Sequence, residues 1–272
     1  MRFYRACLPI LLLLLVSCQT EQYSLQFRTK TQATERYVLE SQMKLILQGG
    51  QAAPEALGST LTAWVQTSPV VSYDDGSGRF LMQVDSANYR SEQRSVEECS
   101  HIERSLTQQE FQYKMAPNGE MQDLRMNEFV PDLENTDIDL RRLLLKVQPV
   151  LPGTPVKVGD TWERQQPLDD GPQAAIVYKW FQVDEIFKHK DKQLVKLRMN
   201  IKYKLDDSTS AQVKLQGNDF ILGSGDVLFN VTDGQIDDAV LEVNGSLSVL
   251  MEHVDNKLPP MQVRQTLHLR RL

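Results

Sequence analysis

The chain has 272 residues, of which 41% are hydrophobic and 24% charged, and its formal net charge is −6. This composition is typical of globular proteins and excludes a disordered chain, while the acidic balance excludes the basic surface that nucleic-acid binding needs. The length is sufficient for one large β domain or two smaller ones.

The first 17 residues have the pattern of an export signal. Arg2 and Arg5 precede an apolar run from Ala6 to Ser17, which at 12 residues is shorter than the roughly 20 that a membrane-spanning helix needs. The run ends in Leu15-Val16-Ser17-Cys18. In this stretch the chain resembles bacterial lipoprotein precursors, whose lipobox has an apolar residue at position −3, then small residues, then a cysteine.

The resemblance implies a processed and lipidated N-terminus. Cleavage after Ser17 would leave Cys18 as the first residue, with a diacylglyceryl group on its thiol and a fatty acid such as palmitate on its amine. Because Gln19 follows where Asp would favour the inner membrane, the resemblance implies a cell-envelope protein of the outer membrane that faces the periplasm. The alternative is an ordinary secretory signal that carries a cysteine.

The predicted anchor keeps the protein next to its membrane. Each buried methylene contributes about 0.8 kcal/mol, so two or three acyl chains make release negligible. Residues 18–22 form a short tether before the first strand-like residues, Tyr23 to Phe27. At this length the tether spans on the order of 15 Å. The sequence therefore predicts a protein that receives, holds or scaffolds something close to the membrane.

Alternating apolar and polar residues dominate the rest of the chain, which indicates antiparallel strands with one dry and one wet face. The clearest such runs are Leu39–Leu47, Phe80–Val84, Val195–Leu205, Leu241–Met251 and Met261–Leu269. Turn-forming residues, such as Asp74 to Gly78 and Asn118-Gly119, separate the runs. Several strands are longer than the usual 5–6 residues, and long strands twist and curl.

One pair of residues in the first half invites a metal-site hypothesis. Cys99 and His101 are two residues apart and would share a face if they lay on a strand. A soft metal would need at least one more ligand, and no Cys or His motif lies near. An ordinary polar pair is therefore the preferred interpretation. Once Cys18 is lipidated and Cys7 removed, Cys99 also has no disulfide partner.

A helix is predicted around residues 137–148. Thr136 and Asp139 have the spacing of a capping box, and Pro149 ends the pattern. Apolar residues between them recur with helical spacing at Leu140, Leu143, Leu144 and Val147. Similar hairpin sequences flank this helix at residues 113–121 and 229–236, so a duplicated β unit is one interpretation.

The segment Leu151-Pro-Gly-Thr-Pro-Val-Lys-Val-Gly-Asp-Thr-Trp162 follows the helix. It resembles the central LPxxPVKVGDxW signature of a family of β-rich bacterial lipoproteins of unknown function, and the resemblance extends loosely over residues 23–272. The family implies no activity. We expect structural roles: Gly159 and Asp160 form a turn into a strand, and Trp162 packs between helix and sheet, with a ligand-stacking role as the alternative.

The strand predicted at 195–205 has a basic face. Four cations alternate with its apolar residues: Lys196, Arg198, Lys202 and Lys204. Such a face could bind anionic lipid headgroups or an acidic partner. The simpler explanation is a solvated strand face, in which lysines prevent aggregation.

No pattern in the sequence points to catalysis or to a cofactor. Gly223-Ser224-Gly225 lacks the strand–turn–helix context of a nucleophilic serine and is better explained by a bulge or tight turn. Adjacent carboxylates, such as Asp206-Asp207 and Asp237-Asp238, would point to opposite faces of a strand. We therefore predict no enzyme, no cofactor and no metal site.

These features together predict a mainly β protein: a long, strongly curved antiparallel sheet, as a half-barrel or open barrel, with one central helix. The expected segments are a signal peptide (1–17), a lipidated tether (18–22), a first β half (23–130), a helical connector (131–152) and a second β half (153–272). The leading function is a non-catalytic lipoprotein that holds an apolar ligand or lipid on the concave face of the sheet. The alternative is an envelope scaffold with a filled core that binds other proteins. An apolar cavity of roughly 300 Å³ or more would favour the ligand.

Overall fold

The computed structural model describes residues 21–29, 33–47, 55–107, 109–126, 138–168, 175–205, 220–247 and 261–272. The predicted signal peptide, its cleavage site at Ser17 and the lipidated Cys18 lie outside these residues. So do Thr136 and the Asp206-Asp207 turn.

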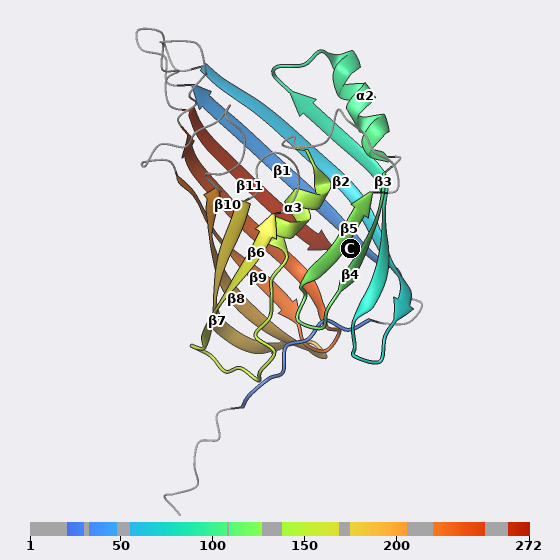
Figure 1. The fold of residues 1–272 in the computed structure, drawn as a ribbon, viewed down its shortest axis with the longest axis vertical. Coiled ribbons are helices and arrows are strands. Elements are labelled where there is room, and N and C mark those ends of the chain that lie inside the picture. Colours follow the sequence, from blue (N-terminus) through green and yellow to red (C-terminus); the bar gives the residue numbers. More distant parts are fainter. Residues whose placement is uncertain are drawn as a thin grey trace, which may run out of the picture.

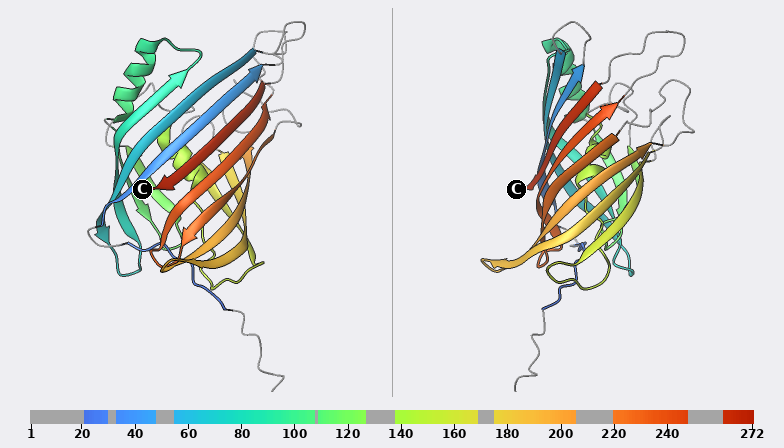
Figure 2. Two further views of the ribbon diagram at one scale, coloured as in Figure 1. Left: turned by 180° about the vertical axis from the view of Figure 1, so that it is seen from behind. Right: turned by 90° about the vertical axis from the view of Figure 1, so that its left-hand side faces the viewer.

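The described residues form a single antiparallel sheet of 11 strands in the order β5-β4-β3-β2-β1-β11-β10-β9-β8-β7-β6. The strands are β1 (Glu35–Leu47), β2 (Glu55–Ser72), β3 (Gly78–Ser91), β4 (Glu110–Met115), β5 (Met121–Met126), β6 (Thr161–Leu168), β7 (Ala175–His189), β8 (Lys192–Leu205), β9 (Phe220–Asn230), β10 (Gln235–Leu247) and β11 (Met261–Arg271). The sheet curls into a half-barrel whose edge strands, β5 and β6, do not pair with each other (Figures 1 and 2). The predicted fold class is confirmed. The first and last strands, β1 and β11, pair in the middle of the sheet.

The alternation that predicted the strands sorts side chains between the two faces of the sheet. On β8, Val195, Leu197 and Met199 are fully buried, whereas Lys196 and Arg198 are exposed or partly exposed on the outer face. Register shifts in four strand pairs mark β-bulges or irregularities: β2–β3 at Trp64/Val65 and Pro69/Val71, β4–β5 at Gln112/Lys114, β7–β8 at Val183/Glu185, and β9–β10 at Ile236/Asp238. Bulges bend strands and increase their twist, which helps a long sheet to curl.

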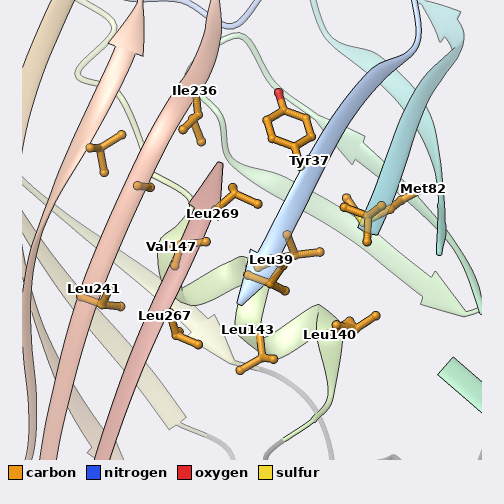
Figure 3. Close-up of a cluster of buried hydrophobic side chains, with 14 of the residues drawn as sticks. Tyr37, Leu39, Met82, Leu140, Leu143, Val147, Ile236, Leu241, Leu267 and Leu269 are labelled. Atoms are coloured by element: carbon orange, nitrogen blue, oxygen red, sulfur yellow. The ribbon is translucent and has the colours of Figure 1, made fainter. Parts of the chain in front are cut away.

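Helix α3 (Leu140–Val147) lies on the concave side of the half-barrel, against β10 and β11. Figure 3 shows Leu143 and Val147 of the helix among the inward-facing residues of the central strands, such as Leu267. The predicted helix is confirmed, but the capping box is not. Asp139 is itself the N-cap, because its backbone is extended and its carboxylate accepts a hydrogen bond from the Arg141 amide.

A second helix, α2 (Val96–Thr107), was not predicted and packs against β3. Ser95 caps it, accepting a hydrogen bond from the Glu98 amide while the Glu98 carboxylate accepts one from the Ser95 amide. Cys99 and His101 therefore lie on a helix, and the shared strand face that the metal-site hypothesis required is absent. Two residues apart on a helix, they point in nearly opposite directions, with Cys99 buried and His101 exposed.

Residues 21–29 cross one end of the half-barrel, which we call the floor (Figure 1). Tyr23 forms an antiparallel bridge with Val156 of the signature segment. Further along, the Phe27 amide donates to the Pro117 carbonyl at 2.7 Å, and its ring packs edge-on against Phe229 with centroids 5.1 Å apart. The N-terminal segment thus joins the connector to hairpins from both halves of the sheet.

Two glycines allow the hairpin turns to meet this segment. Gly119, in the β4–β5 turn, and Gly234, in the β9–β10 turn, both have positive φ angles, of 85° and 68°. A Cβ on Gly119 would lie 2.3 Å from the Phe27 ring, and one on Gly234 would lie 2.5 Å from the Arg28 side chain. Both predicted hairpins are present, although their likeness does not test a duplication.

The Gly223-Ser224-Gly225 stretch contradicts the predicted bulge or tight turn. It lies inside β9, whose register with β10 is uninterrupted from Phe220 to Leu228. The glycines serve close packing instead, since a Cβ on Gly225 would lie 1.9 Å from the Val240 carbonyl oxygen.

Replacing Gly225 by alanine should therefore lower the free energy of unfolding by about 2 kcal/mol or more, because a backbone atom would have to move. Urea denaturation of Gly225→Ala measures the loss. The exposed neighbour Ser224 gives the control, and Ser224→Ala should change stability by less than about 0.5 kcal/mol. Equal stability of the two variants would contradict the close approach of β9 and β10.

Candidate functional site

An apolar pocket lies on the concave side near the floor, between β1–β5, α3 and the β9–β10 hairpin. Most of its lining residues are apolar or aromatic: Phe27, Ala33, Tyr37, Val65, Pro69, Phe80, Met82, Tyr113, Met115, Met121, Leu144, Ile236 and Leu269. Its space free of protein atoms is about 640 Å³ when the open mouth is included. The volume of the cavity itself is only about 50 Å³, which corresponds to a few water molecules. It is well below the roughly 300 Å³ that would favour a ligand, so this criterion favours the filled core of the scaffold alternative.

The walls of the pocket can adapt more readily than its volume suggests. Met82, Met115 and Met121 line one side, and methionine has an unbranched, flexible side chain that fills irregular gaps. Met121 lies on the edge strand β5 and is partly exposed. A change of rotamer at these methionines would widen the pocket without moving the sheet.

Polar groups of the pocket gather where β1 begins. The Tyr37 hydroxyl donates to Gln235 Oε1 at 3.2 Å, and Glu35 Oε2 accepts a hydrogen bond from Arg271 Nε at 2.8 Å. Burial and the nearby Glu35 carboxylate raise the pKa of Tyr37 well above its usual range. The tyrosine hydroxyl is therefore a neutral donor.

Arg271 is the centre of an ion-pair network behind this rim. Besides Glu35, its guanidinium contacts Asp233 at 3.0 Å and Asp237 at 3.1 Å. Lys192 lies 3.5 Å from Asp233 and 3.8 Å from Asp237. The network connects β1, β8, β10, β11 and the β9–β10 turn, and it holds three carboxylates against two cations.

Helix α3, which forms one wall of the pocket, is fixed to the sheet by a buried lysine. Lys179 on β7 donates to the carbonyl oxygens of Leu145 at 2.5 Å and Gln148 at 2.8 Å, both at the end of the helix. These carbonyls have no partner within the helix, and the helix dipole favours a cation there. Burial lowers the pKa of Lys179 to about 7.

The signature residues lie beside α3, as part of the connector between the helix and β6. Gly159 has a φ of 91°, and the Asp160 carboxylate accepts a hydrogen bond from the Lys157 amide at 2.9 Å. Trp162 stacks on Phe181 with centroids 5.2 Å apart, and its indole N–H donates to the Val150 carbonyl. All three have structural partners within the chain. None of them lines the apolar pocket, but all three line a separate, open and more polar hollow together with Pro155 and Arg164.

The candidate basic surface lies on the opposite, convex face of the sheet. Lys196 forms an ion pair with Asp226 at 3.0 Å, and Arg198 forms one with Asp184 at 2.7 Å. Lys202 is exposed, and Lys204 belongs to β8 but its side chain lies outside the described part of the structure. Two of the four cations are thus paired with neighbouring carboxylates, which reduces the positive potential of this face.

Three of the carboxylates considered from the sequence form hydrogen bonds or ion pairs within the chain. Asp75 accepts two hydrogen bonds from Ser77 in a turn, and these lower the pKa of its carboxyl. Asp237 belongs to the Arg271 network, whereas Asp238 lies 2.8 Å from His268. No cluster of three metal-ligating side chains occurs within the described residues. In the same part of the chain, no helix has the length and apolar character required to cross a membrane.

No protein-family model and no curated protein matches the chain. Among solved structures, the fold is similar to part of lipovitellin, in a structure concerned with lipid–protein interactions. The TM-score is 0.58 with 11% sequence identity, over 90% of this chain and 25% of the lipovitellin chain. The chain spans about a quarter of lipovitellin, and at this identity the likeness concerns the fold alone. DynF of the dynemicin pathway of Micromonospora chersina covers 94% of this chain and 87% of its own at 5% identity, but its TM-score of 0.22 is too low to indicate a shared fold.

Proposed function

We propose that the chain is a non-catalytic, membrane-anchored lipoprotein of the cell envelope that holds an apolar ligand or lipid on the concave face of its sheet. The observation that carries the proposal is the apolar pocket beside α3, which has a mouth and a flexible methionine wall. The likeness to the lipovitellin fold supports it, because that structure concerns lipid–protein interactions.

The position of the N-terminal segment also supports this proposal. Tyr23 and Phe27 cross the floor, and Phe27 lines the pocket. Cys18 precedes Tyr23 by five residues, a length that spans at most roughly 18 Å. An acylated Cys18 would therefore hold the floor, and with it the pocket, close to the bilayer. A lipid from that bilayer would have a short path to the pocket.

The full chain, purified from membranes in mild detergent, should carry lipid that native mass spectrometry detects. Its intact mass should also include the acyl groups on Cys18. Ala33→Trp places an indole at the partly exposed edge of the pocket and should remove most of the noncovalent lipid. Ser224→Trp, on the convex face, is the matched control and should retain it. Retention of lipid by a folded Ala33→Trp protein would contradict the assigned site.

The packing of α3 favours a second function, a structural scaffold that binds envelope proteins. The helix packs against β10 and β11 on the concave side, Lys146 donates to Gln265 of β11 at 2.8 Å, and the cavity volume of the pocket is only about 50 Å³. A scaffold predicts purified protein without bound lipid and a reproducible protein adduct after crosslinking in cells. A lipid-loaded protein without such an adduct would exclude it.

A further inference from the structure

We infer that the pocket selects a single-chain amphiphile whose headgroup is neutral or cationic and donates hydrogen bonds, such as a monoacylglycerol, and that it discriminates against the anion of a fatty acid. The inference rests on the proposed function and names the chemical class of the ligand. It is based on the hydrogen-bonding groups and the charge at the polar edge of the pocket.

The polar edge offers a free acceptor. Glu35 is partly buried, and only its Oε2 atom accepts from Arg271. Its other oxygen, Oε1, has no hydrogen-bond partner among the described residues. A carboxylate oxygen accepts and cannot donate, so it binds a hydroxyl or an ammonium group.

Two side-chain donors at this edge, Tyr37 and Gln235, are already engaged within the protein. The Tyr37 hydroxyl donates to Gln235, and Gln235 Nε2 donates in turn to the Arg28 carbonyl at 3.1 Å. On the opposite wall, Gln148 Nε2 donates to the Gly119 carbonyl at 3.4 Å. A carboxylate headgroup needs donors. Apart from the Thr67 and Tyr113 hydroxyls, which line the pocket and hydrogen-bond to each other, it would have to break one of these bonds to obtain one.

The charge at the polar edge of the pocket also disfavours an anionic headgroup. Among the described residues that line the pocket, Glu35 is the only charged one. Its partner Arg271 also contacts Asp233 and Asp237, so that three carboxylates share Arg271 and Lys192. An anionic headgroup would add a fourth negative charge beside partly buried carboxylates, and like charges at short range oppose binding.

The size of the pocket restricts the apolar part of the ligand. Its open volume is too small for an acyl chain unless Met82, Met115 and Met121 change rotamer, and such a change would make room for one flexible chain rather than two. Leu144 of α3 closes the opposite side, and Lys179 fixes the end of that helix. Room for a second chain would require α3 to leave the sheet.

The test compares three ligands of equal chain length on the delipidated full chain at pH 7.5: a monoacylglycerol, a long-chain primary amine and a fatty acid, each below its micelle concentration. Isothermal titration calorimetry should give dissociation constants for the monoacylglycerol and the amine at least tenfold lower than for the fatty acid. Equal or tighter binding of the fatty acid would overturn the inference and leave the proposed function standing. Absence of binding by all three would overturn both.

The variant Glu35→Gln tests whether Glu35 causes the preference for the monoacylglycerol over the fatty acid. It removes the charge but keeps the shape of the side chain, so the fatty acid should bind within about threefold of the monoacylglycerol. Glu163→Gln, on the outer face of β6, is the charge-matched control and should leave the preference at least tenfold. An unchanged preference in folded Glu35→Gln would overturn the inference, and if this variant does not fold, the three-ligand comparison on the natural chain still decides.

Discussion

Replacing Lys179 by methionine should lower the free energy of unfolding by about 2–4 kcal/mol at pH 9, and the loss should shrink as the pH falls toward 7. Methionine fills a similar volume but leaves the Leu145 and Gln148 carbonyls without their donor. Each unsatisfied buried acceptor costs about 1–3 kcal/mol. At pH 9 the natural lysine is neutral and makes these bonds without the cost of burying a charge.

The pH dependence follows from the lowered pKa. Burial lowers the pKa of Lys179 from 10.5 to about 7 in the folded protein. Between these two values the unfolded chain binds a proton that the folded protein does not, so a rise in pH stabilises the folded state. The largest slope for one group is about 1.4 kcal/mol per pH unit. Below pH 7 both states hold the proton, and the contribution of Lys179 becomes constant at its smallest value.

Urea denaturation of the natural chain and Lys179→Met at pH 6, 7, 8 and 9 measures this difference. Comparing the two proteins at each pH removes the contribution of all other titrating groups. Lys202→Met is the control, because Lys202 is exposed on the convex face of β8 and should have no effect that varies with pH. A difference between the natural chain and Lys179→Met that is the same at all four pH values would contradict a titrating, buried lysine.

Lys179 also shows where sequence reasoning succeeded and where it stopped. The alternation that predicted the strands depends only on neighbouring residues. It identified five of the eleven strands, β1, β3, β8, β10 and β11, and the inward-facing row of β8. On β7 the same alternation places Lys179 between Val177 and Phe181, in a buried row. A lysine in an apolar row is a detectable signal of a buried polar contact. Its partners, at the end of a helix more than 30 residues earlier, are not detectable from that pattern.

The missed helix has a different cause. Residues 96–107 carry a capping box at Ser95 and Glu98, but only Cys99, Ile102 and Leu106 are buried. Three apolar residues among polar neighbours are too few to indicate a helix by their spacing, so the sequence indicates only a polar segment there. The pocket could not be predicted at all, because its walls come from strands far apart in the sequence that meet only when β1 pairs with β11.

The pairing of β1 with β11 leads to a second prediction, a large loss of stability in Arg271→Met. This change should lower the free energy of unfolding by about 3–5 kcal/mol, because it leaves Glu35, Asp233 and Asp237 close together without their shared cation. Lys192 offsets only part of the repulsion, since it contacts the two aspartates and is itself about half exposed.

Arg271 and Glu35 are 236 residues apart in the sequence, and they join the last strand to the first. A double-mutant cycle with Glu35→Gln separates this contact from the rest of the network, and Arg271→Met should cost less in the Glu35→Gln protein than in the natural chain. Arg198→Met is the control, since its ion pair with Asp184 is exposed and should contribute at most about 1 kcal/mol. If Arg271→Met cost no more than Arg198→Met in urea denaturation, the network would not stabilise the β1–β11 pairing. The floor and the pocket rim would then depend on the packing and hydrogen bonds of Phe27 and Tyr37.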